Sequence, residues 1–326
     1  MFYRVAPQKT STEALRVASR TFPPPRQSSV CHPEENQGLA ALVQVSRNNE
    51  IVYELKPSLE ACFVGGLVHT TQAGIRAMRD YAPSKPVGTF RILGLGDSLM
   101  FGQGVNNSDV YTVKMEQQLS GRLKHPVEFI NMAVPGYNTA IEVAMLAARG
   151  LNYHPDLIIL HWCENDMGLP FFLEKGQADF SLRQSALLDF IRRDWGLLLE
   201  IKGEVIQDPK LILDRTPIAY RYMVGFEGVV QALDRLQTLT MEPRHIPVLV
   251  VAKNFANTCV AAAVLERAFT SRGFHVLQIG ERSHWWLTSI DAHLNATGHS
   301  GYATMITDAL DAMGLLPGGR SERELQ

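Results

Sequence analysis

The sequence contains few cysteines, no long hydrophobic run and no excess of charge of one sign. Its four cysteines, Cys31, Cys62, Cys163 and Cys259, are widely scattered and form no CxxC pair. We therefore expect neither a disulfide framework nor a cysteine zinc site, and cysteine usage leaves the compartment open. The longest uncharged apolar run in the first half, residues 61–68, is far shorter than the ~20 residues of a membrane-spanning helix, which excludes a transmembrane protein.

The charge balance gives no support to a nucleic-acid partner or to attachment to an anionic membrane. Lysine and arginine number 31 against 33 aspartate and glutamate, for a formal charge of −2. With 46% hydrophobic and 20% charged residues, the 326-residue chain is typical of a globular protein with a sizeable core. Its length predicts roughly two domains of about 150 residues.

The first 27 residues lack the apolar stretch of a secretory signal peptide. They contain arginine, are rich in serine and threonine, and have Glu13 as their only acid, so a transit-like segment stays open as an alternative to a poorly ordered start. A cytoplasmic location is the default expectation.

Composition divides the chain into four parts. Residues 1–48 are predicted to be a poorly ordered extension, since turn and linker residues dominate without sustained periodicity. Residues 49–88 carry short apolar pieces separated by turn residues, which indicates a small β-rich segment. This segment is too small for its own core and should pack on the main domain, residues 89–316. Residues 317–326 form a tail.

The main domain is predicted to be α/β. Apolar strands over 91–95, 127–132, 156–160, 247–251 and 275–279 alternate with helices over 110–123, 140–150, 260–271 and 297–313. Strands that are apolar on both faces indicate a parallel sheet covered by helices on both sides. Residues 167–225, with a helix predicted over 185–199, interrupt this rhythm. They are interpreted as a lid or substrate-shaping insertion, with an ordinary decorated crossover as the alternative.

Polar residues gather where the predicted strands end. Ser98 follows the first strand, Gly136 the second and Asn165 the third, and Asp291 and His293 follow the fifth. Ligands of open parallel sheets bind beyond the carboxyl ends of the strands. Catalysis of acyl transfer by a serine uses these groups together: a hydroxyl, a glycine amide, a side-chain amide and a carboxylate–imidazole pair.

These blocks resemble the SGNH (GDSL) hydrolase family. The first matching motif is the tetrapeptide Gly96-Asp97-Ser98-Leu99, and the resemblance covers residues 90–315. Residues 51–76 are also similar to a flanking region of some larger members. The resemblance implies a flavodoxin-like, three-layer α/β/α sandwich and esterase chemistry that needs neither a metal nor an organic cofactor.

The resemblance also implies a role for each residue. Ser98 would be the nucleophile, His293 its base, and Asp291 the residue that fixes the histidine tautomer. The backbone N–H groups of Ser98 and Gly136 and the side-chain amide of Asn165 would form the oxyanion hole.

Neighbouring residues have less specific interpretations. Asp97 is expected to organise the turn, Asn295 to cap the last helix, and His299 to pack locally rather than to act as the base. Cys163 stands where the family usually has glycine. It is interpreted as a small buried hydrophobe that narrows the site, with redox sensitivity as the lesser alternative.

Three stretches leave their interpretation open. Residues 169–173 either shape an acyl pocket or pack in the core, and residues 284–286 either line the cleft or cover the core. Arg76 either brings a cation to the cleft or is an ordinary exposed arginine. No HExxH or comparable ligand spacing indicates a metal.

The function predicted first is a serine esterase that hydrolyses carboxylic esters or O-acyl groups through an acyl-enzyme on Ser98. One alternative is an O-acyltransferase that moves the acyl group to a glycan hydroxyl, and another is a non-catalytic binding protein on the same fold. The partner is therefore expected to be a small-molecule ester or an acylated saccharide. The sequence determines neither the acyl chain length nor the oligomeric state.

Overall fold

The computed structural model of the chain describes residues 31–176, 216, 218–241, 243–253, 260–280, 282–289 and 291–318. Most of the expected N-terminal extension and most of the expected insertion, including the helix over 185–199, lie outside these residues. So do Cys259 and most of the C-terminal tail.

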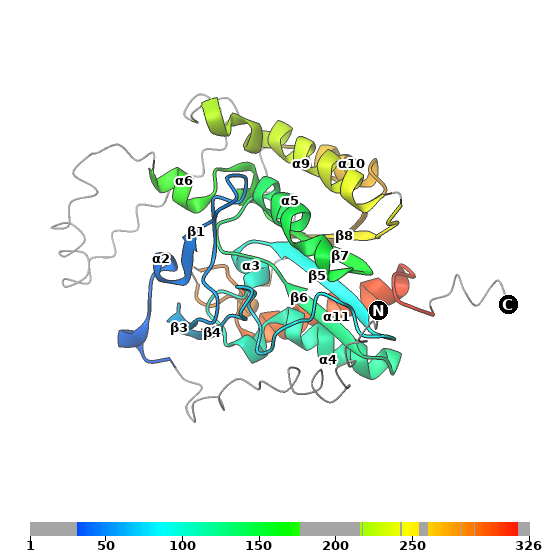
Figure 1. Cartoon of the computed structure of the whole chain (residues 1–326), viewed down its shortest axis with the longest axis horizontal. Helices are drawn as coiled ribbons and strands as arrows, with labels where there is room; N and C mark the ends of the chain where they lie inside the picture. Colours follow the sequence, from blue (N-terminus) through cyan, green and yellow to red (C-terminus); the bar gives the residue numbers. More distant parts are fainter. Residues whose placement is uncertain are drawn as a thin grey trace, which may run out of the picture.

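The centre of the fold is a parallel sheet of five strands in the order β6-β5-β7-β8-β9 (Figure 1). Numbered along the chain this order is 2-1-3-4-5, the flavodoxin-like arrangement, and the α/β prediction is confirmed. Residues of β6 and β7 are all buried, which explains why most of them are apolar. The strands are β5 (Phe90–Gly96), β6 (Val127–Asn131), β7 (Leu157–Trp162), β8 (Val248–Lys253) and β9 (His275–Ile279).

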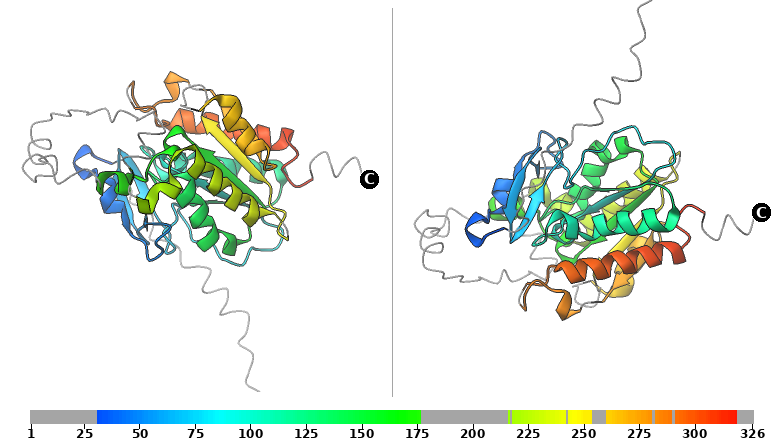
Figure 2. Two further views of the ribbon diagram at one scale, coloured as in Figure 1. Left: turned by 90° about the horizontal axis from the view of Figure 1, so that it is seen from above. Right: turned by 90° about the horizontal axis from the view of Figure 1, so that it is seen from below.

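Helices cover both faces of this sheet and make three layers (Figures 1 and 2). On one face α4 (Tyr111–Leu123) packs beside α11 (Ala296–Ala312), although the two are far apart in the sequence. On the other face lie α5 (Thr139–Ala148), α9 (Gly225–Thr240) and α10 (Ala262–Thr270). The helices and strands predicted for the main domain begin and end within a few residues of those observed.

Short elements connect the layers at the sheet ends. They are α3 (Ser98–Phe101), η2 (Asn107–Asp109), η3 (Gly150–Tyr153), η4 (Glu164–Met167), α6 (Phe171–Gly176), η6 (Ile218–Met223) and η8 (Ser283–Trp285). Three of them, α3, η4 and η8, begin within a few residues of the carboxyl ends of β5, β7 and β9. Ser98 and Asn165 are therefore held in short helical turns, in α3 and η4.

The N-terminal segment, residues 31–88, is built from two antiparallel strand pairs and packs against the end of the sheet near α3 (Figure 1). Apolar residues of its strands are buried in the same core as the main domain. Its elements begin before residue 49, where the β-rich segment was expected to start. They are η1 (Pro33–Glu35), α2 (Leu39–Leu42), β1 (Val43–Val45), β2 (Tyr53–Leu55), β3 (Glu60–Phe63) and β4 (Gly66–His69).

A disulfide joins Cys31 to Cys62 in this segment, so the expectation from cysteine spacing was wrong. The two cysteines are 31 residues apart in the sequence. An isolated β-bridge, formed by backbone pairing of Asn36 with Cys62, brings the start of the segment alongside β3. Scattered cysteines exclude a cluster, but they say nothing about which distant segments become neighbours on folding.

Arg76 also departs from expectation, because it is neither exposed nor directed to a cleft. It is 3% exposed, and its guanidinium donates to the carbonyls of Phe101, Gly102 and Val105 at 2.6–2.7 Å. A fourth bond goes to the side chain of Asn107 at 2.9 Å. The N-terminal segment thereby holds the chain that leaves α3.

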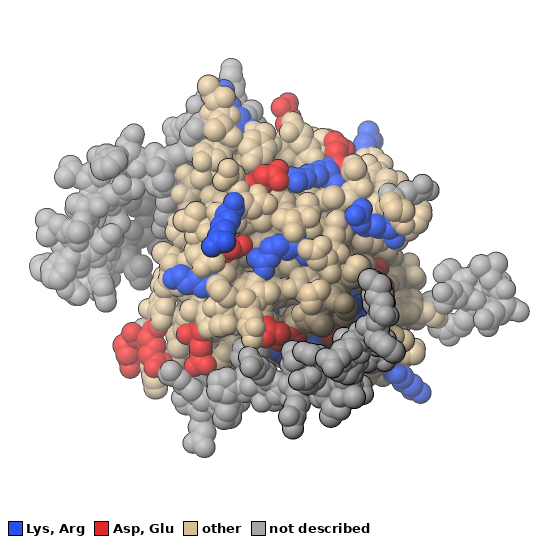
Figure 3. Space-filling model, viewed as in Figure 1, with Lys and Arg blue, Asp and Glu red and all other residues tan. Residues whose placement is uncertain are grey.

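No helix of the described residues is both long enough and apolar enough to cross a membrane. Over the described part of the face in Figure 3, cationic and anionic side chains are interspersed among uncharged residues. That distribution agrees with the nearly balanced charge of the sequence.

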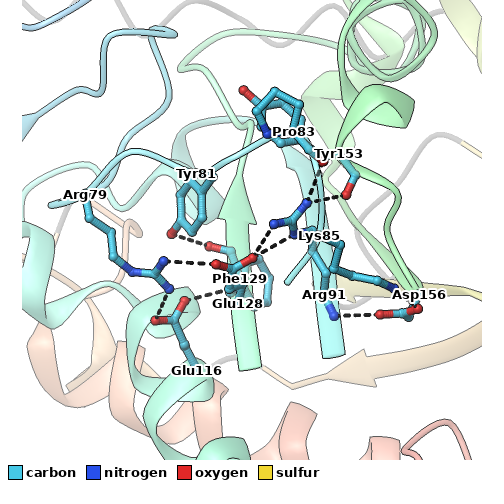
Figure 4. A network of polar contacts seen from close by, with 10 residues as sticks. All are labelled: Arg79, Tyr81, Pro83, Lys85, Arg91, Glu116, Glu128, Phe129, Tyr153 and Asp156. Carbon is cyan, nitrogen blue, oxygen red and sulfur yellow. Dashed lines mark hydrogen bonds and ion pairs between the residues drawn. The ribbon is translucent and has the colours of Figure 1, made fainter. Parts of the chain in front are cut away.

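A second polar network ties the N-terminal segment to the start of the sheet (Figure 4). Arg91 is fully buried, and its guanidinium contacts Glu128 at 2.5 Å and donates to the carbonyls of Pro83 and Tyr153. Arg79 contacts the same Glu128 at 3.1 Å. Each of the three guanidinium nitrogens of the buried cation thus donates at least one hydrogen bond.

Replacing Arg91 with methionine should lower the free energy of unfolding by about 3–5 kcal/mol, because it leaves the Glu128 carboxylate without its buried partner. Urea unfolding at neutral pH measures the change. Arg122→Ala, which removes an exposed ion pair with Asp308, is the control and should cost less than about 1 kcal/mol. Equal effects in the two variants would contradict this account.

Candidate active site

Ser98 begins α3 directly after β5, at the carboxyl end of the strand between β6 and β7. Asp97 caps this helix, since its Oδ1 accepts the N–H of Leu99 at 3.0 Å. The helix turns back over the strand so closely that a Cβ at Gly96 would lie 2.9 Å from the Cβ of Met100. The sharp turn leaves Ser98 half-buried at the sheet edge.

A chain of hydrogen bonds runs from Ser98 through His293 to Asp291. The Ser98 Oγ lies 2.8 Å from His293 Nε2, and His293 Nδ1 lies 2.6 Å from Asp291 Oδ1. An ionised carboxylate only accepts hydrogen bonds, so the Nδ1 carries the proton and the Nε2 is left to accept from the serine hydroxyl. The structure thus brings together the three side chains that the sequence predicts as a triad.

The loop after β9 holds Asp291 and His293 in place. The backbone N–H of His293 donates to Asp291 Oδ1 at 3.0 Å, and Asn295 braces the loop by donating to the carbonyls of His284 and Trp286. Asn295 also caps α11 through the N–H of Gly298, as expected.

His299 is remote from this arrangement. It is 1% exposed, and its Nδ1 accepts the backbone N–H of Tyr111 at 3.3 Å.

Trp285 is buried against α11, where a Cβ at Gly301 would meet its ring at 2.4 Å. His299 therefore packs locally, and Trp285 covers the core.

Asp291 stays ionised in this setting. Burial on its own would raise the pKa of Asp291, but hydrogen bonds from the backbone and ring of His293 outweigh it and lower the pKa below its ordinary value. The side chains of His293 and Asp291 are 27% and 32% exposed, so water reaches the pair. A carboxylate that remains charged can stabilise an imidazolium beside it.

Asn165 is linked to the nucleophile turn through Asp97. Its Nδ2 donates to Asp97 Oδ2 at 2.7 Å, and the Ser98 hydroxyl lies 3.3 Å from the same oxygen. One carboxylate therefore caps α3 and fixes an amide from the end of β7. The expectation that Asp97 organises the turn is in agreement with these contacts.

Gly136 lies in a tight turn after β6. The N–H of Tyr137 donates to the carbonyl of Val134 at 3.1 Å, and Gly136 has a φ of +76° after Pro135, which is the pattern of a type II turn. A Cβ at Gly136 would lie 2.5 Å from the Cβ of Phe171, so only glycine fits.

Comparison with known proteins identifies the family of the chain. A sequence profile of the GDSL-like lipase/acylhydrolase family matches residues 95–300, well over half of the chain. The chain belongs to this family. Membership confirms the resemblance to the SGNH (GDSL) hydrolases and makes the protein a member of a hydrolase family. A search of curated proteins finds no match.

Solved structures of esterases and lipases are similar to part of the chain. The psychrotrophic esterase EstA from Pseudoalteromonas sp. is 12% identical over 68% of this chain and 97% of its own, with a TM-score of 0.43. The lipase/acylhydrolase from Enterococcus faecalis is 14% identical over 68% and 95%, with a TM-score of 0.39. A two-domain esterase, CEX, active on acetylated mannans, is 17% identical over 69% and 49%, with a TM-score of 0.43.

This member of the GDSL-like family buries two acidic side chains, those of Asp166 and Glu142, next to residues 163–166, which follow β7. Asp166 Oδ2 accepts the N–H of Cys163 and the hydroxyl of Thr139, both at 3.2 Å. One turn further along α5, Glu142 is 1% exposed and has no hydrogen-bond partner among the described residues. Burial raises the pKa of Glu142 and of Asp166 well above the ordinary values, and repulsion from Asp97 adds to the effect on both.

Cys163 is buried, as the sequence interpretation expected. Its side chain is in the core cluster, and its Sγ lies 3.7 Å from Asp97 Oδ1. Burial raises the pKa of the Cys163 thiol well above its ordinary value, with a further contribution from Asp97. The thiolate is the reactive form of cysteine, so this residue is not an activated nucleophile.

Sequence reasoning did not find Tyr53, Gln103 or Glu142. Gln103 Nε2 lies 3.5 Å from His293 Nδ1, and Tyr53 contacts the turn of Gly136. Strand alternation in β2 indicates only that Tyr53 is buried, and nothing in the sequence gives its partner. Among the described residues, no group of three or more histidine, cysteine, aspartate or glutamate side chains could hold a metal ion.

Glu142→Met should raise stability by an amount that grows with pH. The raised pKa keeps Glu142 protonated in the folded protein, whereas the unfolded chain releases the proton above pH ~4.5. The free energy of unfolding of the unsubstituted protein therefore falls as the pH rises, by up to about 1.4 kcal/mol per pH unit, until the pH reaches the pKa of Glu142 in the folded protein.

Urea unfolding between pH 5 and 8 measures the difference. Glu142→Gln is the matched control, since it removes the same titration but retains a polar group, and should show the same slope with a smaller gain. A difference between Glu142→Met and the unsubstituted protein that stays constant over this pH range would contradict the buried, protonated state.

Proposed function

We propose that this protein is a serine esterase that hydrolyses carboxylic esters or O-acyl groups through an acyl-enzyme on Ser98. The observation that supports this most is the chain of hydrogen bonds from Ser98 to His293 to Asp291, at 2.8 and 2.6 Å, at the carboxyl end of the sheet. Membership of a family of lipases and acylhydrolases supports the same chemistry.

Acylation begins when the Ser98 Oγ attacks the ester carbonyl carbon. The hydroxyl proton passes to His293 Nε2, the imidazolium is stabilised by Asp291, and the carbonyl oxygen becomes an oxyanion. The C–O bond to the alcohol then breaks, and His293 returns its proton to the departing alkoxide. The product is an alcohol together with an acyl group esterified to Ser98.

The oxyanion would be held by the backbone N–H groups of Ser98 and Gly136 and by the side chain of Asn165. The amide of Asn165 has two N–H bonds, and Asp97 accepts one of them at 2.7 Å, which leaves the second for the substrate. Donors fixed before the reaction stabilise the transition state without reorganising, and each is worth about 3–4 kcal/mol.

Deacylation repeats these steps with water. His293 takes a proton from a water molecule as its oxygen attacks the acyl carbon, and then returns the proton to the Ser98 Oγ as the acid leaves. The partial exposure of His293 and Asp291 gives water a route to this position.

The disulfide supports a location other than the cytoplasmic default. Disulfides persist in oxidising environments and are rare in the cytosol. We therefore propose that the protein, with Cys31 and Cys62 joined, acts in an oxidising compartment. Its substrate would then be a small ester or an acylated saccharide present there.

Ser98→Ala should lower kcat for a p-nitrophenyl ester by at least about 10³-fold, because the members of a triad act as a unit. Ser300→Ala is the matched control, since this hydroxyl donates to a carbonyl on the exposed surface of α11. A fluorophosphonate probe should label the unsubstituted protein at Ser98 and leave the Ser98→Ala variant unlabelled.

The same assay distinguishes the alternatives when an acylated donor and a glycan acceptor are both supplied. Free acid as the product supports hydrolysis, and an acylated glycan would identify a transferase. A folded protein that neither turns over nor reacts with the probe would be a binding protein, and near-normal turnover by Ser98→Ala would overturn the mechanism.

A further inference from the structure

The orientation of one peptide decides whether Gly136 can serve as an oxyanion donor. Pro135 and Gly136 occupy the two central positions of the turn, so the peptide between them carries the Pro135 carbonyl and the Gly136 N–H. In a trans peptide these two groups point in opposite directions. Types I and II of this turn differ mainly by a flip of this central peptide, which reverses the direction of the N–H.

The turn sequence alone does not determine that orientation. Proline at the second position suits both turn types, and glycine at the third is free to adopt either sign of φ. Proline followed by glycine favours the type II conformation, in which Gly136 has a φ of +76°, and a contact from outside the turn can hold the peptide in that orientation.

Tyr53 of β2 makes that contact. Its hydroxyl donates to the carbonyl oxygen of Pro135 at 3.1 Å, on the side of the peptide opposite to the Gly136 N–H. Tyr53 is 3% exposed, and its ring is held edge-on by Tyr137 and Phe172 at centroid distances of 5.1 and 4.9 Å. The position of the hydroxyl is therefore fixed by packing.

The contact between β2 and the turn is reciprocal. The Tyr137 hydroxyl donates back to the carbonyl of Tyr53, so residues on both sides of Gly136 are bonded to the same residue of the N-terminal segment. The peptide after Gly136 is held separately, because the N–H of Phe171 donates to the Gly136 carbonyl at 3.0 Å. The carbonyls of both peptides that flank Gly136 thus accept a hydrogen bond from outside the turn.

We propose that Tyr53 is a positioning residue, whose hydroxyl holds the Pro135–Gly136 peptide so that the Gly136 N–H faces the oxyanion. This inference rests on the proposed function, in which Gly136 is an oxyanion donor. It makes the N-terminal segment, which lies outside the matched residues 95–300, part of the catalytic apparatus.

The chemistry of the tyrosine suits this role. Burial raises the pKa of Tyr53 far above its ordinary value, with a further contribution from Asp97, so the hydroxyl stays protonated and donates at every pH at which the protein works. Donation to a carbonyl also polarises its peptide and makes the N–H on the other side a stronger donor.

Tyr53→Phe tests the proposal, because it removes only the hydroxyl and retains the ring. We expect kcat for a p-nitrophenyl ester, counted per fluorophosphonate-reactive site, to fall about tenfold, less than the 10²–10³-fold typical of losing a donor outright. KM should change by less than about twofold, since the ground-state carbonyl depends little on the oxyanion donors. The affinity for an alkyl boronic acid, which forms a tetrahedral adduct on serine, should fall by the same factor as kcat.

Tyr81→Phe is the matched control. Tyr81 belongs to the same N-terminal segment, and its hydroxyl also donates to a backbone carbonyl, that of Phe129 at 2.8 Å, but in the network at the start of the sheet (Figure 4). Its kcat and boronate affinity should stay within about twofold of the unsubstituted protein. An equal loss in both variants, or an unchanged kcat in Tyr53→Phe, would overturn the proposal.

One further variant completes the test. Tyr137→Phe removes the reciprocal bond but leaves the Tyr53 hydroxyl on Pro135, so it should lose less kcat than Tyr53→Phe, and it provides the readout if Tyr53→Phe does not fold. A tenfold or larger loss in Tyr137→Phe would assign the effect to packing and contradict the proposal. If Ser98→Ala retains turnover, the proposed function fails and this inference fails with it; if only the Tyr53 result is negative, the esterase mechanism stands.

Discussion

The hydrogen bond between Ser98 and His293 joins residues 195 positions apart, and the arrangement of the site depends on it. Neither side chain is reactive alone, since a serine hydroxyl keeps its proton at neutral pH unless a base lies within reach. The parallel sheet supplies that proximity because β5 and β9 run in the same direction and end at the same edge. The packing that aligns the strands therefore also determines whether the serine hydroxyl and the imidazole meet.

Most of this arrangement could be predicted from the sequence, because it rests on local patterns. Strands apolar on both faces indicate a parallel sheet, and a polar residue after each strand is then placed at a known edge. Asp291 and His293 are two residues apart, so a single loop holds both. The capping role of Asn295 follows equally from its position before a helix.

What the sequence could not predict are contacts between distant segments that leave no periodic trace. Cys31 pairs with Cys62 only because the chain folds back along β3. Arg76 looks like a surface residue until its four acceptors, which lie between the last residue of α3 and η2, are in place. A buried arginine is identified by its partners, and here the partners are mostly backbone carbonyls, which every sequence has.

Residues 163–166, which follow β7, show how one residue of the family pattern can change while the backbone geometry is kept. The family usually has glycine at the position of Cys163, but Cys163 has a φ of −129° and a ψ of 164°, an extended conformation that any residue adopts. Conformational freedom is thus not required at this position, in contrast to Gly136. What the position needs is a small side chain, because its Sγ lies 3.7 Å from the carboxylate of Asp97, which orients Asn165. A thiol satisfies that need, whereas a larger side chain would displace Asp97 and with it the amide that would bind the oxyanion.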